Sequence, residues 1–335
     1  MATSDGRKVV VITGASAGVG RAAVRAFAER GAHVGLVARG RDGLEAARAE
    51  VEARGGRGLV LPCDVSDPAA VEEAAERVER ELGPIDVWVN NAMVSVFAPI
   101  AETTAEEFRR VIEVTYLGYV HGTLSALKRM KLRDRGVIVQ VGSALAYRSI
   151  PLQAAYCAAK HAVTGFTESL RSELLHDKSG IHVTEVHLPA VNTPQFGWSR
   201  AKLPREPQPV PPIFQPEIAA DAIVFASEAR RRDVRVGWPV TKAIVGDKVA
   251  PAYADHYLAR HGYDGQQTDE PIDPHRRDNL YEPLPGDAGA HGTFDARARS
   301  FSLAWAVNKH RGVLLAAGAC ALAVAGWATV RALQA

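Results

Sequence analysis

Cysteine is scarce in this chain, and so is any excess of one charge. The three cysteines among 335 residues are Cys63, Cys157 and Cys320, an odd number without the close pairs that a disulfide framework or a zinc site needs. We therefore expect a reduced protein with no bound metal. The 40 Lys and Arg against 38 Asp and Glu give a formal charge of +2 at pH 7. Acids and bases are interspersed, so no polyanion-binding field forms and nucleic acid is not an expected partner.

Long uncharged runs are also rare. No apolar stretch precedes the first strand-like run at Lys8, so the sequence predicts no cleaved secretory signal. One uncharged run does occur, at Gly312–Val330, between the basic residues 309–311 and Arg331. As a helix it would measure about 28 Å, which is close to the hydrocarbon thickness of a bilayer. We expect it to cross a membrane once, with the large domain on the cytoplasmic side because more basic residues precede the run than follow it. The alternative is a buried C-terminal helix, since the run is rich in Ala and Gly.

From Lys8 onward, short Val/Ile/Leu runs alternate with longer segments of helical period, which is typical of βαβ units and a parallel sheet. Strands are expected at Lys8–Ile12, Val34–Ala38, Gly58–Leu61, Ile85–Val89, Val137–Val141 and His182–Leu188, with Val234–Val236 as a candidate seventh. Helices are expected at Gly18–Arg30, Arg41–Arg54, Pro68–Leu82, Thr104–Leu132, Ala154–Asp177 and Gln215–Ala229. The order predicts an α/β fold with a doubly wound sheet and right-handed crossovers.

The amino-acid composition changes twice after this region. Lys202–Pro216 holds six prolines and is expected to be a loop. Asp264–Arg299 is dense in Pro, Gly and Asp, and is expected either to wrap the domain or to link it to the uncharged C-terminal run. We therefore divide the chain into a catalytic domain of residues 7–245, an extension of residues 246–300 and the helix of residues 312–330.

A glycine-rich turn, Thr13-Gly14-Ala15-Ser16-Ala17-Gly18-Val19-Gly20, follows the first expected strand directly and opens a helix. Glycines in such a turn let the backbone approach a pyrophosphate, whose charge then faces the amides and the positive end of the helix. A glycine-rich stretch alone is often only a tight turn. The strand before it and the helix after it favour dinucleotide binding here.

The end of the second expected strand bears on which dinucleotide binds. A carboxylate there would select NAD by bonding the adenosine ribose, but the sequence has Arg39 and then Arg41. A guanidinium pairs well with a 2′-phosphate, so Arg39 favours NADP over NAD, whereas Arg41 also fits a surface charge. Asp64, after the third expected strand, is placed either to accept a hydrogen bond from the adenine amino group or to cap a turn.

A second constellation consists of Ser143, Tyr156 and Lys160. Ser143 closes an expected strand, and Tyr156 and Lys160 share one face of the next helix. The ammonium of Lys160, together with a positive nicotinamide ring, would lower the pKa of the phenol and make Tyr156 an acid or base near neutral pH. Ser143 would donate a hydrogen bond to the substrate oxygen. The carboxyl edge of the sheet, where Ser143 lies, is where open α/β folds bind their ligands.

These motifs, taken in order, resemble those of the short-chain dehydrogenases/reductases, in the branch with shorter single-domain subunits. The resemblance covers about residues 7 to 240. It is carried by the glycine-rich turn, Asn90-Asn91-Ala92, Ser143, Tyr156-x-x-x-Lys160, and Pro189 with Thr193. It implies a Rossmann fold with a seven-stranded sheet, NAD(P)-dependent interconversion of alcohols and carbonyls, and a homodimer or homotetramer.

The same resemblance assigns roles to residues. It makes Tyr156 the catalytic acid/base and Asn90 a residue that stabilises the sheet near the cofactor. It places Thr193 and the backbone after Pro189 against the nicotinamide. The full set expected at the cofactor is Thr13, Gly14, Ser16, Gly18, Val19, Gly20, Arg39, Asp64, Val65, Asn90, Ala92, Tyr156, Lys160, Pro189, Val191 and Thr193.

Three positions depart from the family pattern. Met93 stands where the motif Asn90-Asn91-Ala92 normally continues with Gly, and Ala190 replaces the Gly that normally follows Pro189. Thr115 stands where many members have an Asn that holds a water for a proton relay, which puts the relay in doubt.

The substrate is expected between Leu145–Ile150 and the segment Gln195–Phe214. Phe196, Trp198 and Phe214 indicate an apolar pocket, although each could instead anchor a long loop. A membrane tail would also favour a lipophilic alcohol or ketone. The alternatives are a non-catalytic NADP-binding sensor and a membrane-tethered scaffold that docks a partner through Asp264–Arg299.

Overall fold

The computed structural model describes residues 6–312 and 331. Its centre is a sheet of seven parallel strands in the order β11-β7-β6-β4-β1-β2-β3. The strands are β1 Val9–Thr13, β2 His33–Ala38, β3 Gly58–Pro62, β4 Val87–Asn90, β6 Gly136–Ser143, β7 Ile181–Leu188 and β11 Asp233–Arg235. The predicted doubly wound α/β fold is confirmed. The chain order reverses between β1 and β4, so a crevice is expected at their carboxyl ends.

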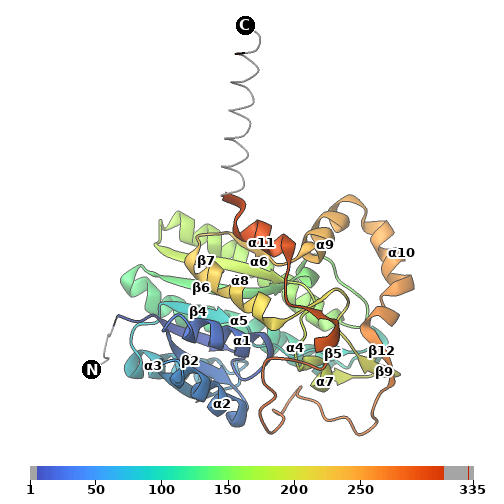
Figure 1. The fold of residues 1–335 in the computed structure, drawn as a ribbon, viewed down its shortest axis with the longest axis horizontal. Coiled ribbons are helices and arrows are strands. Elements are labelled where there is room, and N and C mark those ends of the chain that lie inside the picture. The colour runs from blue at the N-terminus through green and yellow to red at the C-terminus, as the bar shows by residue number, and fades with distance from the viewer. Residues whose placement is uncertain (1–5, 313–330, 332–335) are drawn as a thin grey trace.

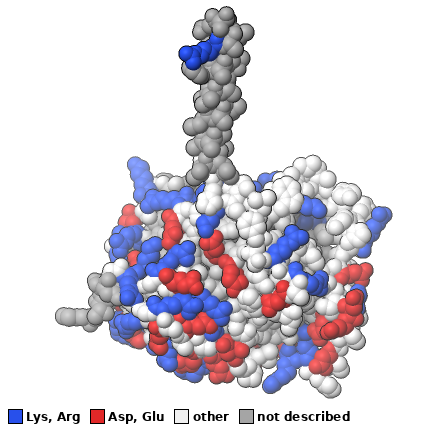
Figure 2. Space-filling view, viewed as in Figure 1, with Lys and Arg blue, Asp and Glu red and all other residues white. Residues whose placement is uncertain are grey.

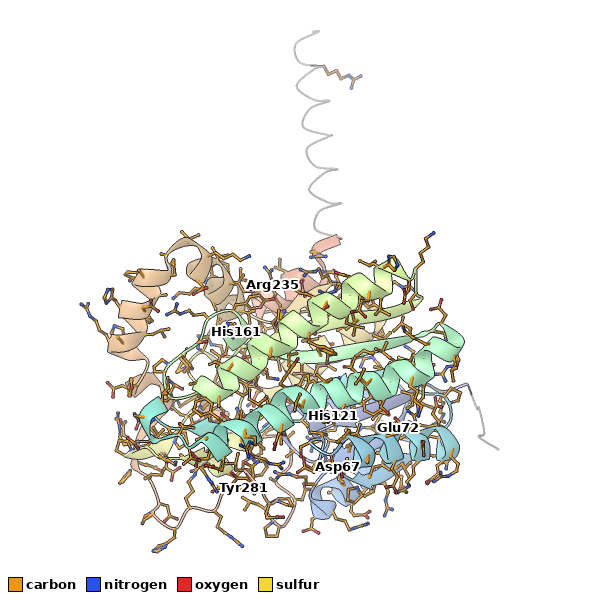
Figure 3. All side chains as sticks on the ribbon, turned by 180° about the vertical axis from the view of Figure 1, so that it is seen from behind. Asp67, Glu72, His121, His161, Arg235 and Tyr281 are labelled. Carbon is orange, nitrogen blue, oxygen red and sulfur yellow. The ribbon has the colours of Figure 1, made fainter. Side chains whose placement is uncertain are left out.

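Helices cover both faces of the sheet (Figure 1). One face carries α1 Gly18–Ala28, α2 Arg41–Glu52 and α8 Pro216–Glu228. The other carries α3 Pro68–Glu81, α4 Ala105–Ile112, α5 Gly118–Met130 and α6 Ala154–His176, and Figure 3 shows α5 and α6 crossing it. Neighbouring residues of β1 point to opposite layers, with Val10 and Ile12 in one core and Val9 and Val11 in the other. This explains why the strands are apolar throughout.

The long helix expected at Thr104–Leu132 is interrupted. It begins with a capping box between Thr104 and Glu107, and a π-helical turn at Glu113–Leu117 separates α4 from α5. Within that turn, the Thr115 hydroxyl donates to the carbonyl of Val94 over 2.9 Å and accepts from the amide of Val94 over 3.1 Å. The turn therefore ties the helix to the segment that follows β4.

The extension wraps the domain, which decides between the two alternatives for Asp264–Arg299. It starts with α9 Trp238–Val249 and α10 Pro251–His261, so the boundary at residue 245 falls inside α9. The segment after α10 runs along the lower edge of the molecule in Figure 1. Short strand pairs fasten it to the proline-rich region that was expected to be only a loop: β12 Gln267–Pro271 pairs with β9 Arg205–Pro207, and β13 Ala298–Arg299 pairs with β10 Ile213–Phe214.

The run expected to cross a membrane, residues 312–330, lies outside the described residues except for Gly312. Among the residues that the structure does describe, no helix is both long and apolar enough to span a bilayer. Just before the run, α11 Leu303–Lys309 packs on α8. Buried Trp305 and Lys309 both donate to the carboxylate of Asp221 over 2.8 Å. Figure 2 shows basic and acidic side chains interspersed on this face of the domain.

Candidate active site

A cavity of about 600 Å³ opens at the carboxyl edge of the sheet. Most residues expected at the cofactor line it, together with Ser143. They are Gly14, Ser16, Gly18, Val19, Arg39, Asp64, Val65, Ala92, Tyr156, Lys160, Pro189, Val191 and Thr193. The structure thus gathers side chains from across the domain at the place where an open α/β sheet binds its ligand.

Three residues of the expected set shape the cavity from behind. The Thr13 hydroxyl accepts hydrogen bonds from the amides of Asn91 and Ala92, which holds the segment after β4 against the end of β1. The side-chain nitrogen of Asn90 donates to Thr123 and Gln140 in the sheet interior, and its oxygen accepts from Trp88. Gly20 is needed because a Cβ there would lie 2.0 Å from the carbonyl oxygen of Gly14.

The glycine-rich turn presents the first turn of α1 to the cavity. Gly14 and Gly18 have φ angles of +68° and +56°, in the region that favours glycine. Beneath the turn, the Arg21 guanidinium is buried and donates to the carbonyls of Ser16 and Gly43. A helix N-terminus held this way is suited to binding a phosphate group.

At the far end of the cavity lie Arg39 and Asp64. The half-buried Arg39 guanidinium donates to backbone carbonyls of the C-terminal extension, including that of Tyr281 over 2.6 Å. Burial lowers the pKa of Arg39, and the charge of Asp64 opposes this. Asp64 itself accepts from Ser66 and from Arg110, so it forms the turn that was one of its two expected roles, and it also lines the cavity. Despite burial, these hydrogen bonds lower the pKa of Asp64.

Ser143, Tyr156 and Lys160 meet at the other end. Burial raises the pKa of Tyr156, opposed by its hydrogen bond with Ser143. The lowering expected from the sequence requires the charges of the Lys160 ammonium and of a nicotinamide ring, so it stays a prediction for the cofactor complex. Burial also lowers the pKa of Lys160 to about 7, opposed by the charge of Glu185. The Ser143 hydroxyl accepts from the amide of Leu145 over 3.1 Å and can still donate toward the cavity.

The partners of Lys160 were not expected from the sequence. Its Nζ donates to the Tyr119 hydroxyl over 2.8 Å and to the carbonyl of Val141 over 2.7 Å. Tyr119 is fully buried and donates to the same Val141 carbonyl over 3.0 Å. No local pattern marks Tyr119, because it comes from α5 and meets Lys160 only when α5 and α6 pack together.

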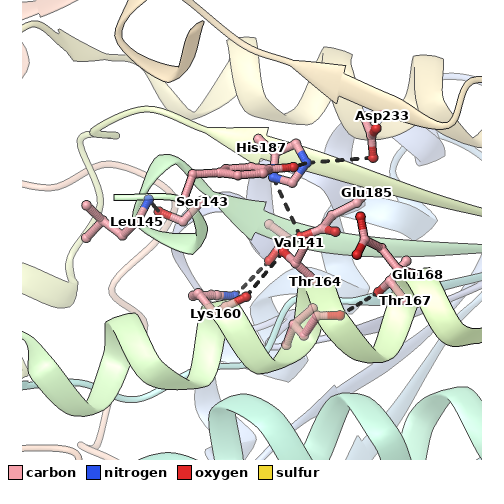
Figure 4. A network of polar contacts seen from close by, with 12 residues as sticks. Val141, Ser143, Leu145, Lys160, Thr164, Thr167, Glu168, Glu185, His187 and Asp233 are labelled. Atoms are coloured by element: carbon pink, nitrogen blue, oxygen red, sulfur yellow. Dashed lines mark hydrogen bonds and ion pairs between the residues drawn. The ribbon is translucent and has the colours of Figure 1, made fainter. Parts of the chain in front are cut away.

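On β7 and β11, the buried Glu185 and His187 and the partly buried Asp233 form a cluster (Figure 4). These three side chains are spaced so that they could hold a metal ion. The sequence prediction of no metal considered only the cysteines and did not consider this cluster. However, the Nε2 atom of His187 is 3.0 Å from the Tyr147 hydroxyl, and the Arg171 guanidinium is 3.6 Å from Asp233. The Thr164 hydroxyl also donates to Glu185 over 2.8 Å, while the Nδ1 atom of His187 has no hydrogen-bond partner among the described residues. These contacts with other side chains favour an internal polar network over a metal centre.

The three departures from the family pattern have different structural outcomes. Met93 and Ala190 both line the cavity, so each adds apolar surface where the pattern has glycine. Thr115 is completely buried, and its hydroxyl both donates to and accepts from the Val94 backbone. A water-holding role for Thr115 would have to compete with those two hydrogen bonds.

The expected substrate region is apolar, with one correction. Phe196 and Trp198 line the cavity along with Leu145, Ile150 and Val210. Phe214 instead belongs to the hydrophobic core beneath α8, so it anchors the proline-rich segment, which was its alternative role.

The chain is similar to known proteins over most of its length. A sequence model described as short chain dehydrogenase matches residues 8–203. An uncharacterised oxidoreductase of Bacillus subtilis is 32% identical over 277 residues, which span 82% of this chain and 78% of the relative. A fatty acyl-CoA reductase of Acinetobacter baylyi is 32% identical over 229 residues, which span 68% of this chain and 75% of the relative.

Two solved structures share the fold. A short-chain dehydrogenase from Streptomyces avermitilis superimposes with a TM-score of 0.64 at 28% identity, covering 78% of this chain and 99% of the other. An alcohol dehydrogenase from the archaeon Thermococcus sibiricus, in complex with 5-hydroxy-NADP, gives a TM-score of 0.60 at 29% identity and covers 68% of this chain and 95% of the other.

Proposed function

Because the chain belongs to the short-chain dehydrogenase family, we propose that it interconverts a carbonyl and an alcohol with NADP(H), using Tyr156 as the acid/base. One observation carries this proposal. Ser143, Tyr156 and Lys160 line the same cavity as the glycine-rich turn and the first turn of α1. Catalytic groups and a phosphate-binding backbone therefore face a single space.

The residues divide the reaction among them. A bound nicotinamide dinucleotide would donate or accept the hydride, and its oxidised ring would add positive charge beside the phenol. Ser143 donates a hydrogen bond to the carbonyl oxygen, which orients the carbon for hydride transfer. Tyr156 delivers the proton to that oxygen during reduction and removes it during oxidation. Lys160, when protonated, favours the phenolate form of Tyr156 by its charge.

The choice of NADP rests on the end of β2. Arg39 lines the cavity there, and no carboxylate occupies that position to bond a 2′-hydroxyl. The Thermococcus sibiricus neighbour, described as complexed with 5-hydroxy-NADP, supports the same cofactor class. NAD is the second choice.

A lipophilic substrate is supported by the lining and by one relative. Phe196, Trp198 and Leu145 give the substrate end of the cavity an apolar surface. The Acinetobacter baylyi relative is named for a fatty acyl substrate. We therefore expect turnover of long-chain or ring-bearing aldehydes and ketones to exceed that of small hydrophilic carbonyls.

The membrane anchor belongs to this proposal on sequence grounds alone. The uncharged run Gly312–Val330 between basic residues supports it. Sedimentation of the full chain with liposomes, compared with a chain ending at Arg311, tests it. Equal sedimentation of both chains would show that the run does not anchor the chain to a membrane. Light scattering of both purified chains without liposomes tests the homodimer or homotetramer that the family resemblance implies.

The central experiment measures oxidation of NADPH and NADH by the purified full chain across aldehydes and ketones of rising hydrophobicity. We expect NADPH-dependent turnover that falls by about 10²- to 10⁴-fold in Tyr156→Phe, with NADPH binding retained. Tight NADPH binding without turnover of any carbonyl would instead favour the non-catalytic sensor. An unchanged rate in Tyr156→Phe would remove Tyr156 from the reaction.

A further inference from the structure

The C-terminal extension forms one wall of the cavity. Asn279 and residues 283–288 line it together with the glycine-rich turn and Arg39. We propose that residues 279–290, here called the strap, close over the bound dinucleotide and that the dinucleotide binds and leaves only when the strap lifts. This inference rests on the proposed function to the extent that a dinucleotide occupies the cavity.

The strap has a first anchor at the Arg39 end. Leu280 is fully buried in the hydrophobic core, and its carbonyl accepts a hydrogen bond from the Nε of Arg110 over 3.0 Å. Arg39 donates to the carbonyls of Asn279 and Tyr281 on either side of it. The anchor thus combines a buried side chain with backbone carbonyls held by two guanidinium groups.

A second anchor lies at the glycine-rich turn. The amide of Gly18, the first residue of α1, donates to the carbonyl of Gly289 over 3.0 Å. The buried Arg21 donates to the carboxylate of Asp287 over 3.0 Å. The amide of Gly286 donates to the carboxylate of Asp42 over 2.8 Å. Ala290, the last residue of the strap, is buried in the core on the same side of the sheet as α1.

Between these anchors the strap contains no helix or strand, and most of residues 281–288 are exposed on their outer side. Its inner side lines the cavity, so it forms part of the wall between the cavity and solvent. Pro283 and Pro285 restrict the backbone there, which favours movement of the segment as a unit rather than gradual fraying. A segment held at two ends and free in the middle can lift once either end is released.

The position of the strap matches the path that a dinucleotide would take. Its anchors lie at Arg39, where the adenosine would bind, and at Gly18, where the pyrophosphate would bind. A dinucleotide seated between them would be covered along its adenosine half. Lifting the strap would then limit both association and dissociation, because the same barrier is crossed in either direction.

The test measures the fluorescence of NADPH in stopped-flow experiments on the full chain. Leu280→Ala removes the buried side chain that holds the first anchor in the hydrophobic core, and Leu280 does not line the cavity itself. Asp287→Ala releases Arg21 at the second anchor. We expect each variant to raise the association and the dissociation rate constants by about tenfold or more, with a smaller change in Kd.

Two matched controls come from the same C-terminal region. Leu303→Ala truncates an exposed leucine of α11, and Asp264→Ala removes an ion pair with Arg205 away from the cavity. Both should keep the rate constants of the original chain. Circular dichroism shows whether each variant is folded. If Leu280→Ala is unfolded, the rate constants of Asp287→Ala decide the test.

The outcomes separate the strap from the function on which it rests. If the unaltered chain binds neither NADPH nor NADH, the proposed function and the strap both fail. If it binds NADPH and the strap variants keep both rate constants, only the strap fails as a lid. A rise confined to the dissociation rate constant would also contradict the proposal, because that result is expected of a fixed wall that contacts the ligand without moving. Slower hydrogen exchange of residues 279–290 on NADPH binding is the expected second readout.

Discussion

The Nζ atom of Lys160 lies 2.8 Å from the hydroxyl oxygen of Tyr119, and both groups donate to the carbonyl of Val141. This triangle fixes the position of the amine beneath the ring of Tyr156, whose centroid is 5.6 Å from Nζ. We therefore predict that Tyr119 acts on the site through Lys160, as a positioning residue.

Replacing Tyr119 by Phe tests that role. The variant keeps the ring but removes an acceptor from Lys160, and we expect kcat to fall by about tenfold, in line with the value of a hydrogen bond to a charged group. The KM for the carbonyl should change little. The pH profile of kcat should shift as well, because the environment of Lys160 changes. A lower kcat with an unshifted pH profile would indicate a purely structural role.

Lys160 also makes stability depend on pH. Burial lowers its pKa to about 7, below the ordinary 10.5, so the folded chain releases this proton at a lower pH than the unfolded chain does. Between pH 7 and 10.5 the unfolded state holds more protons, and the free energy of unfolding should rise with pH by up to about 1.4 kcal/mol per unit from this group. Urea unfolding at pH 7, 8 and 9 measures it.

Lys160→Met is the control for that measurement, since it keeps the length of the side chain and removes the titration. The difference in unfolding free energy between the original chain and this variant isolates Lys160 from other titrating groups. It should move in favour of the original chain as pH rises. Parallel curves for the two proteins would show that Lys160 titrates normally in the folded state.

Arg39 is predicted to distinguish the two dinucleotides. Arg39→Ala removes the guanidinium that would pair with a 2′-phosphate and that also holds the strap. Release of the strap would act on both dinucleotides, whereas loss of the phosphate partner acts on NADPH alone, so NADPH affinity should fall by about 10- to 100-fold while NADH affinity changes less. Fluorescence titration of both cofactors gives the ratio. Arg41→Ala is a suitable control, because Arg41 pairs with Glu45 on the helix surface. An unchanged NADPH-to-NADH ratio in Arg39→Ala would rule out this role.

Thr115 is predicted to stabilise the fold through its hydroxyl. Thr115→Ala would leave the buried amide and carbonyl of Val94 without this partner, and the free energy of unfolding should fall by about 1–3 kcal/mol. Thr115→Ser retains the hydroxyl and should lose much less. Chemical denaturation of both variants measures the contrast. Equal losses would show that the methyl group, rather than the hydrogen bonds, matters at this position.

Several features could be predicted from the sequence because they depend on local order along the chain. Apolar periodicity is set by the repeat of a strand or a helix, so the seven strands were predicted within a few residues, as were the helices that alternate with them except for the break at Glu113–Leu117. The glycine-rich turn was recognisable for a similar reason, since Gly14 and Gly18 adopt backbone angles that other residues avoid. Ser143, at the end of a strand, and Tyr156 and Lys160, four residues apart on the next helix, were predicted to act together, and the structure places all three at one cavity.

The tertiary structure decided what depends on contacts between distant segments. Tyr119 meets Lys160 only because α5 and α6 pack together, and His187 meets Asp233 only because β7 and β11 are neighbours. Arg39 and the amide of Gly18 donate hydrogen bonds to backbone carbonyls of the strap. Every residue has a backbone carbonyl, so no pattern of side chains predicts these contacts. Burial, which raises the pKa of Tyr156, is likewise a property of the packed protein. The sequence by itself thus determined the sheet and the candidate reactive residues, whereas the packing of the extension against the domain decided which backbone segment forms one wall of that cavity.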